Sequence, residues 1–179
     1  MNILVVVDMQ KDFITGALGN SQCEACVPEV VKAINDPKYD RIYVTLDTHT
    51  EDYLNTQEGA KLPVVHCVKG SDGWALDDNI CAALKANPLN DGRVKMFEKE
   101  TFGSKELGEE FRQYADMEDV NVDMVGVCTG ICVISNAFII KANAPEAAVA
   151  VIEKACACVT PATHRTAIDA MKLCQIEIK

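Results

Sequence analysis

Four ionisable side chains of this sequence come shortly after runs of apolar residues that are typical of buried strands: Asp8, Asp47, Lys99 and Cys132. The carboxyl ends of parallel strands meet at one edge of a sheet, so the four side chains are expected to lie close together. A carboxylate, an ammonium and a thiol at close range supply a base, an electrostatic support and a nucleophile. Each residue alone has an ordinary structural explanation, and only their convergence predicts chemistry.

Cys132 lies in the segment Gly-Val-Cys-Thr-Gly-Ile-Cys-Val of residues 126–133. We expect its thiol on the first turn of a helix, where unpaired backbone N–H groups and the positive end of the helix dipole favour the thiolate. The same N–H groups could bind the oxyanion of a tetrahedral intermediate. In isolation the segment fits an inert core cysteine better, so the prediction depends on Asp8 and Lys99.

A second group of side chains could hold a metal ion. Asp47 and His49 are two residues apart, and His66 is another of only three histidines in the chain. One carboxylate and two imidazoles suit Zn²⁺, Mn²⁺ or Fe²⁺. The spacing alone favours this site no more than it favours a capping aspartate and two partly exposed histidines.

Apolar runs and helical patterns alternate along the chain. The predicted fold is therefore one α/β domain over residues 1–179, with a mostly parallel six-stranded sheet between two layers of helices, a Rossmann-like three-layer arrangement. Residues 47–89 form the irregular exception. Strands are expected at residues 3–7, 41–46, 93–97, 120–127, 148–152 and 175–178, and helices at 27–34, from Ser104 onwards, at 130–142 and at 160–173.

Composition narrows the possible partners and compartment. The formal net charge of −10 argues against nucleic acid, whose phosphates would be repelled. No apolar run approaches the roughly 18 residues that span a bilayer, and the chain does not begin with a secretion signal, so no membrane is expected. Nine cysteines without an export signal predict reduced, mostly buried thiols in the cytoplasm. Cys23 and Cys26 have no partner pair and are expected around the start of a helix.

Three ordered motifs resemble the signatures of the isochorismatase-like cysteine hydrolases, and within them the nicotinamidase branch. They are Val-Val-Asp8-Met-Gln-Lys-Asp-Phe, Phe-Glu-Lys99-Glu-Thr-Phe-Gly-Ser and Gly-Val-Cys-Thr-Gly-Ile-Cys132-Val. The similarity continues to His164, so it covers nearly the whole chain and implies the isochorismatase-like hydrolase fold. It also implies an Asp–Lys–Cys triad, in which Asp8 is the general base, Lys99 holds the thiolate and lowers the thiol pKa, and Cys132 attacks an amide to form a thioester. A cis peptide before Cys128 would aim the N–H groups of Cys128 and Cys132 at the oxyanion.

The resemblance extends to the candidate metal site. Nicotinamidases bind a divalent metal through an Asp-x-His pair and a later histidine, which implies Asp47, His49 and His66 as ligands of Zn²⁺, with Mn²⁺ or Fe²⁺ as alternatives. Glu58 is the candidate fourth ligand, whereas Asn55 departs from members that carry a third histidine. Three aromatic residues near the motifs could bind a flat substrate ring, or simply pack in the core: Phe13, Trp74 and Phe102.

The implied reaction is hydrolysis of a small carboxamide to an acid and ammonia, with nicotinamide as the leading substrate. Leu62 stands where nicotinamidases often carry a tryptophan that walls the ring pocket, so two alternatives stay open. One is hydrolysis of another small amide, such as an N-carbamoyl compound or a ureide, and the other is a non-catalytic small-ligand binding protein. By analogy with the family, we expect a homo-oligomer, either a dimer or a tetramer.

Overall fold

The computed structural model describes all residues from 1 to 179 and contains one six-stranded sheet. The strand order is β3-β2-β1-β4-β5-β6, and every neighbouring pair is parallel. This confirms the predicted α/β class and the predicted number of strands. The strands are β1 (Asn2–Val7), β2 (Arg41–Asp47), β3 (Val94–Lys99), β4 (Asn121–Val127), β5 (Ala148–Ala157) and β6 (Glu177–Ile178).

The central strand β1 is apolar because both of its faces are covered. Its residues from Ile3 to Val7 are completely buried. Val6 pairs with Val44 on one side and with Val125 on the other, so β1 lies between β2 and β4. Burial on both faces fixes this strand at the middle of the molecule, and Asp8 directly follows its carboxyl end.

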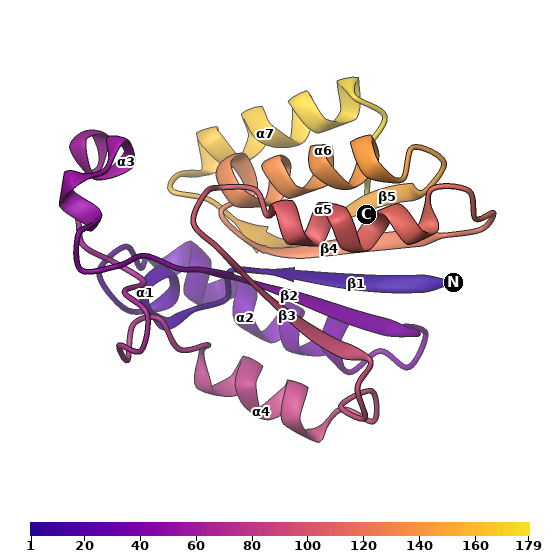
Figure 1. The fold of residues 1–179 in the computed structure, drawn as a ribbon, viewed down its shortest axis with the longest axis horizontal. Helices are drawn as coiled ribbons and strands as arrows, with labels where there is room; N and C mark the ends of the chain where they lie inside the picture. The colour runs from indigo at the N-terminus through magenta and orange to yellow at the C-terminus, as the bar shows by residue number, and fades with distance from the viewer.

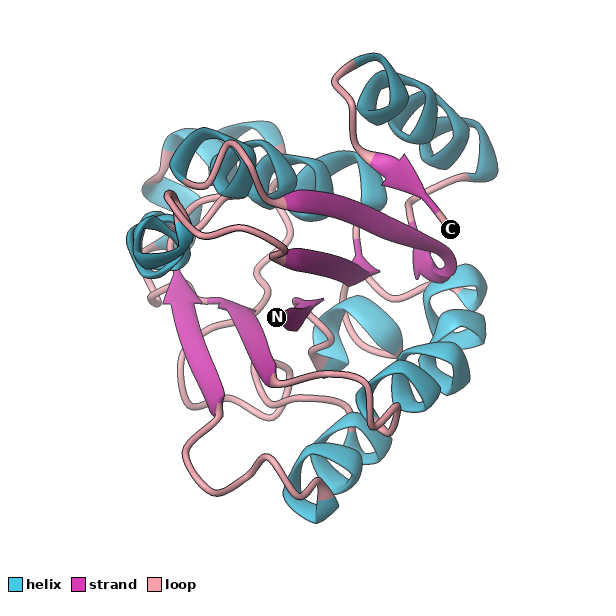
Figure 2. Cartoon of the chain, turned by 90° about the vertical axis from the view of Figure 1, so that its right-hand side faces the viewer, coloured by secondary structure: helices cyan, strands magenta, loops and turns pink.

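Helices cover both faces of the sheet. On one face α2 (Ser21–Ile34) packs on β4, β5 and α4 (Asp78–Ala86), whereas α5 (Lys105–Phe111), α6 (Ile134–Asn143) and α7 (Pro161–Leu173) cover the other face (Figure 1). Figure 2 shows the twisted sheet end-on between these two layers. The shorter elements are α1 (Lys11–Ile14), α3 (Gln57–Lys61), the 3₁₀ turns η1 (Tyr53–Asn55) and η2 (Arg112–Tyr114), and the π-helical turn η3 (Thr129–Val133).

The predicted start of α2 at Val27 is wrong, because the helix begins six residues earlier at Ser21. The Asn20 side chain caps it by accepting the N–H groups of Gln22 and Cys23. Pro28 therefore lies inside the helix rather than near its start. By contrast, α7 begins as predicted, with Thr160 as the capping residue and Pro161 at the first helical position.

The irregular segment after β2 lies at the carboxyl edge of the sheet. In Figure 1 it loops out beyond the ends of the strands, carries η1 and α3, and returns to the sheet face through α4. Most of this segment lacks long elements, as predicted, but α4 is a regular helix capped by Asp77. The segment carries His49, Glu58 and His66 over the strand ends.

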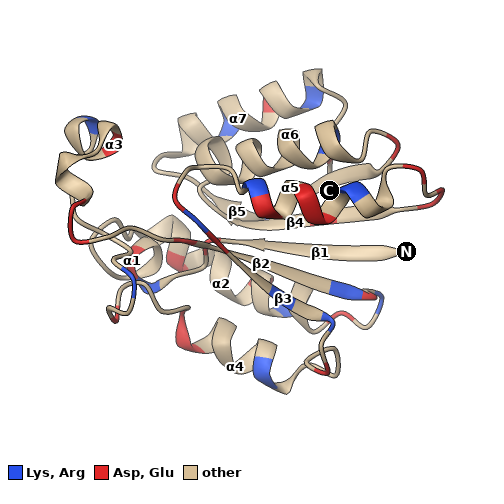
Figure 3. Ribbon diagram, viewed as in Figure 1, with Lys and Arg blue, Asp and Glu red and all other residues tan.

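Charged residues are distributed over the helices and loops of both layers, while β1 carries none (Figure 3). This matches a solvated surface around an apolar sheet. None of the helices combines the length and the apolar character that a membrane span requires.

Candidate functional site

The Lys99 ammonium lies at the centre of the candidate site. Its Nζ is 2.7 Å from Asp8 Oδ2, 2.9 Å from Asp47 Oδ1 and 3.5 Å from Cys132 Sγ. The four residues follow the carboxyl ends of different strands or end them, and all four are buried. The fold thus brings together the four side chains that the sequence singled out.

Lys99 is charged despite its burial. Burial by itself lowers the pKa of an ammonium, but Asp8 and the other acidic groups around Lys99 hold its pKa well above the usual range. A permanently positive Lys99 can compensate one negative charge, whether Asp8 or Cys132 carries it. The position of Lys99 at the end of β3, paired with Asp47 at the end of β2, keeps it in this place.

Asp8 is a buried carboxyl group poised to exchange a proton. Its Oδ1 accepts a hydrogen bond of 2.6 Å from Thr45 Oγ1, whereas Oδ2 forms an ion pair of 2.7 Å with Lys99 Nζ. Burial raises the pKa of Asp8, and the Lys99 charge only partly opposes this rise. A carboxylate with a raised pKa is a stronger base than an exposed aspartate.

Cys132 lies in η3, directly before α6, and is 5% exposed. The predicted lowering of its thiol pKa is not observed: burial, together with the negative charge of Asp8, raises the pKa of Cys132 well above its usual value. The Lys99 charge acts in the opposite direction but does not outweigh burial. Cys132 therefore rests as a thiol and needs a base to become a nucleophile.

The turn before Cys132 approaches β1 closely. The Val127–Cys128 peptide is cis, as the resemblance implied. Gly126 has a φ of 119° and a Cβ here would collide with the Val7 carbonyl, so only glycine fits. The Cys128 N–H has no hydrogen-bond acceptor in the protein and remains available to a ligand.

Asp47, His49 and His66 form a compact group that could hold a metal ion, with all three ligand atoms within 4.8 Å of one another. His49 Nε2 is buried and lies 3.0 Å from Asp47 Oδ2 without a hydrogen-bond partner. His66 Nε2 is 3.4 Å from the same oxygen. A buried imidazole nitrogen without a partner fits a metal ligand, since an unsatisfied nitrogen would otherwise be costly.

The surroundings of His66 set its orientation. Its Nδ1 lies 2.8 Å from the Val64 carbonyl, which places the proton on Nδ1 and leaves Nε2 free as a ligand. Glu58 Oε1 lies 3.8 Å from His49 Nε2 and 4.0 Å from His66 Nε2, so the structure places the candidate fourth ligand beside the group. Burial, with the nearby Asp47 charge, raises the pKa of Glu58.

A largely apolar pocket of about 270 Å³ opens onto Cys132. Phe13 and Phe102, two of the three aromatic residues singled out in the sequence, line this pocket. Trp74 does not, because its indole N–H instead donates a 2.9 Å hydrogen bond to Thr48 Oγ1. The remaining lining residues are Leu18, Asp47, Glu58, Leu62, His66, Cys128, Ile131 and Val159.

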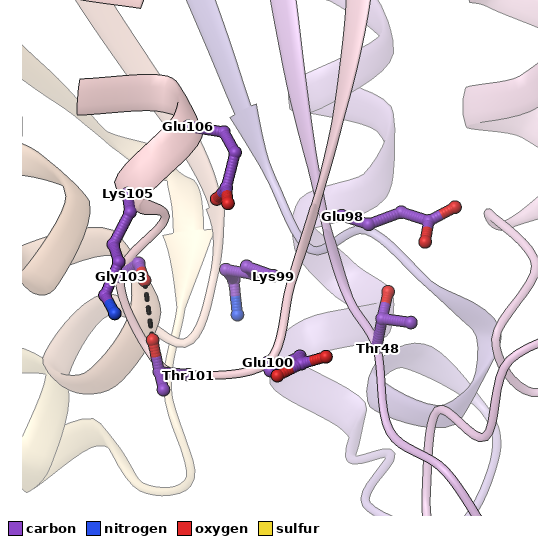
Figure 4. Close-up of a pocket in the computed structure, with 8 residues that line it drawn as sticks. All are labelled: Thr48, Glu98, Lys99, Glu100, Thr101, Gly103, Lys105 and Glu106. Atoms are coloured by element: carbon purple, nitrogen blue, oxygen red, sulfur yellow. Dashed lines mark hydrogen bonds between the residues drawn. The ribbon is translucent and has the colours of Figure 1, made fainter. Parts of the chain in front are cut away.

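A second pocket, of about 280 Å³, lies around the end of β3 and has no apolar lining residue. In Figure 4 the side chains of Lys99 and Glu98 point to opposite sides of β3. The Thr101 hydroxyl donates a hydrogen bond to the Gly103 carbonyl. Cys132 does not line this pocket. The apolar pocket is therefore the better candidate for an uncharged aromatic ligand.

Two buried polar residues that the sequence did not single out hold the site together. Gln10 Nε2 donates to the Asp47 carbonyl at 2.8 Å, and Gln10 Oε1 accepts the Asp47 N–H at 2.8 Å. Asn136 Nδ2 donates to the Cys132 carbonyl at 2.8 Å, and its Oδ1 accepts the Ser104 N–H. Asn136 thereby ties the turn of Cys132 to the loop after Lys99. The signal that could have identified Asn136 is a polar residue in the mostly apolar helix α6.

The sequence profile of the isochorismatase domain matches residues 2–178. The chain belongs to the isochorismatase family. It is therefore an isochorismatase-family hydrolase with the predicted fold. A search of curated proteins found no match.

Solved structures of similar fold include several amidases. A pyrazinamidase/nicotinamidase from Streptococcus mutans UA159 superposes with a TM-score of 0.86 at 22% identity and full coverage of both chains (100% of each). The nicotinamidase/pyrazinamidase PncA of Bacillus subtilis gives 0.84 at 19% identity, over 99% of this chain and 98% of that one. A pyrazinamidase of Pyrococcus horikoshii, solved in complex with zinc, gives 0.79 at 25% identity, over 99% and 98%.

Proposed function

We propose that this isochorismatase-family hydrolase cleaves a small aromatic carboxamide, nicotinamide first among the candidates, to the acid and ammonia through a thioester on Cys132. One observation carries the proposal: the Lys99 ammonium lies 2.7 Å from Asp8 and 3.5 Å from Cys132, and Cys132 lines an apolar pocket. The pocket has room for a single ring, and its aromatic walls, Phe13 and Phe102, suit a flat one.

The first step forms the thioester. Asp8 takes the proton of the Cys132 thiol, and the sulfur forms a bond to the amide carbonyl carbon. The raised pKa of Asp8 makes this transfer easier than it would be to an exposed carboxylate. Lys99 stays within reach of both groups and offsets the negative charge wherever it resides.

The oxyanion of the tetrahedral intermediate would accept the unpartnered N–H of Cys128, beside that of Cys132. Asp8 then returns its proton to the amide nitrogen, the carbon–nitrogen bond breaks and ammonia leaves. Water attacks the thioester, Asp8 takes a proton from it, and the Cys132 sulfur leaves and is reprotonated. The acid is released and the thiol is restored, so no group of the protein is consumed.

The group of Asp47, His49 and His66 would hold one divalent metal, and Zn²⁺ suits these ligands. When bound, the metal would offer an open position for a ring nitrogen and so orient the substrate. Thiol attack on an amide does not need a metal, so the role we assign to these residues is substrate positioning. The zinc complex of the Pyrococcus horikoshii pyrazinamidase supports this choice of metal.

Ammonia release from nicotinamide by purified protein tests the proposal directly. We expect turnover in the intact protein and a loss of about 10³-fold or more with Cys132→Ala, since the nucleophile is removed. Cys174→Ala is the matched control, because Cys174 is an exposed thiol outside the site. Absence of turnover with the intact protein, or full turnover with Cys132→Ala, would overturn the assignment. A non-catalytic binding protein would bind nicotinamide without releasing ammonia.

Hydrolysis of an N-carbamoyl compound or a ureide is the second candidate function, favoured by two lining residues. Leu62 is smaller than the tryptophan expected in a nicotinamide pocket, and the Glu58 carboxylate enters the same pocket. Ureide N–H groups could donate to Glu58, whereas the nicotinamide ring has no such donors. A panel of amides and ureides, assayed with and without a chelator, separates the two functions.

A further inference from the structure

Three cysteines other than Cys132 lie together behind the turn that carries it. Cys128 precedes η3, Cys158 follows β5, and Cys23 lies in the first turn of α2. All nine cysteines of the chain are free thiols. The proposed hydrolysis uses the backbone N–H of Cys128 but none of these three sulfur atoms, so their clustering calls for a separate explanation.

The strand register brings Cys128 and Cys158 side by side. Val127 at the end of β4 pairs with Ala157 at the end of β5, so the two cysteines are the next residues on neighbouring strands. Paired strands lie about 4.8 Å apart, and a disulfide spans roughly 4.4–6.8 Å between Cα atoms. The two side chains also lie close enough for each thiol to shift the pKa of the other.

The environment of Cys158 favours a thiolate. The Cys128 thiol, the Thr163 side chain and backbone N–H groups of Gly130 and Val159 lower the pKa of Cys158 to about 5. The Sγ of Cys158 lies 3.5 Å from where a Cβ of Gly130 would be, so it packs directly against the turn of Cys132. Thiolates, unlike thiols, react readily with peroxides.

Small molecules can approach Cys158 from two sides. It lines one pocket of about 260 Å³ with Cys26 and His164, and another of about 370 Å³ with Ile131. Cys128 lines the substrate pocket. Cys23 also lies next to Cys128, and both Cys23 (1% exposed) and Cys158 (2% exposed) are buried, but Cys23 lines neither of the two pockets that Cys158 lines. Accessibility therefore favours Cys158 over Cys23 as the partner of Cys128.

We propose that Cys128 and Cys158 are a modification site at which a peroxide, either hydrogen peroxide or an organic hydroperoxide, converts two thiols into a disulfide. The Cys158 sulfur attacks a peroxide oxygen, the O–O bond breaks, and a sulfenic acid and hydroxide form. The Cys128 sulfur then attacks the sulfur of Cys158 and displaces its hydroxyl group. The two thiol protons leave in the products, so two thiols and one hydrogen peroxide give one disulfide and two waters.

The modification would act on the site through the backbone. Cys128 contributes the free N–H and directly precedes the turn that contains Cys132, so a bond to Cys158 would shift the N–H away from the oxyanion. This consequence rests on the proposed function. The formation of the disulfide does not depend on catalysis and can be measured separately.

The test uses full-length Cys132→Ala protein, which retains eight of the nine thiols. We expect peroxide to lower the number of alkylatable thiols from eight to six. Peptide mass spectrometry should map a Cys128–Cys158 bond. Dithiothreitol should restore all eight thiols. Eight alkylatable thiols after peroxide treatment would overturn the proposal, as would a bond that joins Cys23 to Cys128 instead. The Cys158→Ala variant should lose the bond and the matched Cys174→Ala variant should keep it, both in the Cys132→Ala background.

The intact protein supplies the functional readout. If it hydrolyses an amide, peroxide should lower the rate, dithiothreitol should restore it, and Cys158→Ala should resist the loss. A mapped disulfide in a protein that hydrolyses no amide would contradict the proposed function and leave the modification site supported. Equal inactivation of the intact protein and Cys158→Ala would overturn the regulatory consequence.

Discussion

The Asp47 carboxylate contacts Lys99 through Oδ1 at 2.9 Å, while its Oδ2 faces the two imidazoles of the candidate metal site. One side chain therefore belongs to both clusters. Burial alone would raise the pKa of Asp47, but His49, His66 and Lys99 hold it well below its usual range. The Asp47 carboxylate stays ionised. A change in charge at the candidate metal site therefore alters the electrostatic environment of Lys99, and the reverse also holds.

Asp47→Asn should lower the rate of amide hydrolysis even in protein stripped of metal. The neutral amide no longer balances the Lys99 charge, and we expect a loss of roughly tenfold, equivalent to about 1.4 kcal/mol. The measurement is kcat/KM in excess chelator, with His66→Asn as the comparison. If Asp47 served the metal alone, both variants would match the intact protein under these conditions.

The activity should fall at acid pH through protonation of Asp8. Burial raises the pKa of Asp8, and the base works only when ionised, so activity is lost as the pH falls through this raised value. The acid limb of the profile of kcat/KM should therefore lie above the ordinary aspartate pKa of about 3.9. Asp8→Asn should remove this limb and lower the rate by about 10²-fold or more. An unchanged acid limb in Asp8→Asn would assign it to another group.

One Zn²⁺ should bind per chain, and His66→Ala should weaken the binding. Loss of a direct ligand should exceed the roughly 10–100-fold cost of removing a hydrogen bond from a metal-bound histidine. Isothermal titration of chelator-treated protein gives the stoichiometry and affinity. His164→Ala is the matched control, because His164 bonds Thr129 outside this group. Equal weakening in both variants would place the metal elsewhere.

Asp123 should stabilise the fold at neutral pH. Although burial opposes ionisation, Lys179, Lys38 and Tyr39 hold the pKa of Asp123 below its usual value. A lowered folded-state pKa adds stability above the unfolded-state pKa of about 3.9, and that stability is lost as the pH falls further. Asp123→Asn should therefore lower the free energy of unfolding by about 1–3 kcal/mol at pH 7.

Urea unfolding at pH 7 and at pH 3 measures this difference. The destabilisation by Asp123→Asn should shrink at pH 3, because the Asp123 carboxyl of the unfolded chain, with a pKa of about 3.9, is largely protonated there. Asp116→Asn is the control, because Asp116 has no ion-pair partner. A destabilisation that stays the same at both pH values would show that the charge of Asp123 does not contribute.

Much of the architecture could be predicted from local patterns. The aliphatic run of β1 and the Thr160–Pro161 start of α7 are strong signals, because burial on both faces and helix capping restrict the residue types allowed. The start of α2 was missed because Pro28 resembled a first-turn proline, while the true cap, Asn20, lies farther upstream. The partners of Gln10 and Asn136 could not be predicted, since they are distant segments of the chain.

The sequence by itself determined the strand ends at which Asp8, Lys99 and Cys132 are placed, because alternation of buried strands and helices leaves few other topologies. Only the tertiary structure decided the state of these groups. It buried Cys132 beside Asp8, which raises the thiol pKa where the helix dipole alone would lower it. It also placed Cys158 beside Cys128 and turned Trp74 toward Thr48. Burial, charge pairing and strand register depend on contacts between residues far apart in the chain, so they could not be predicted from local sequence.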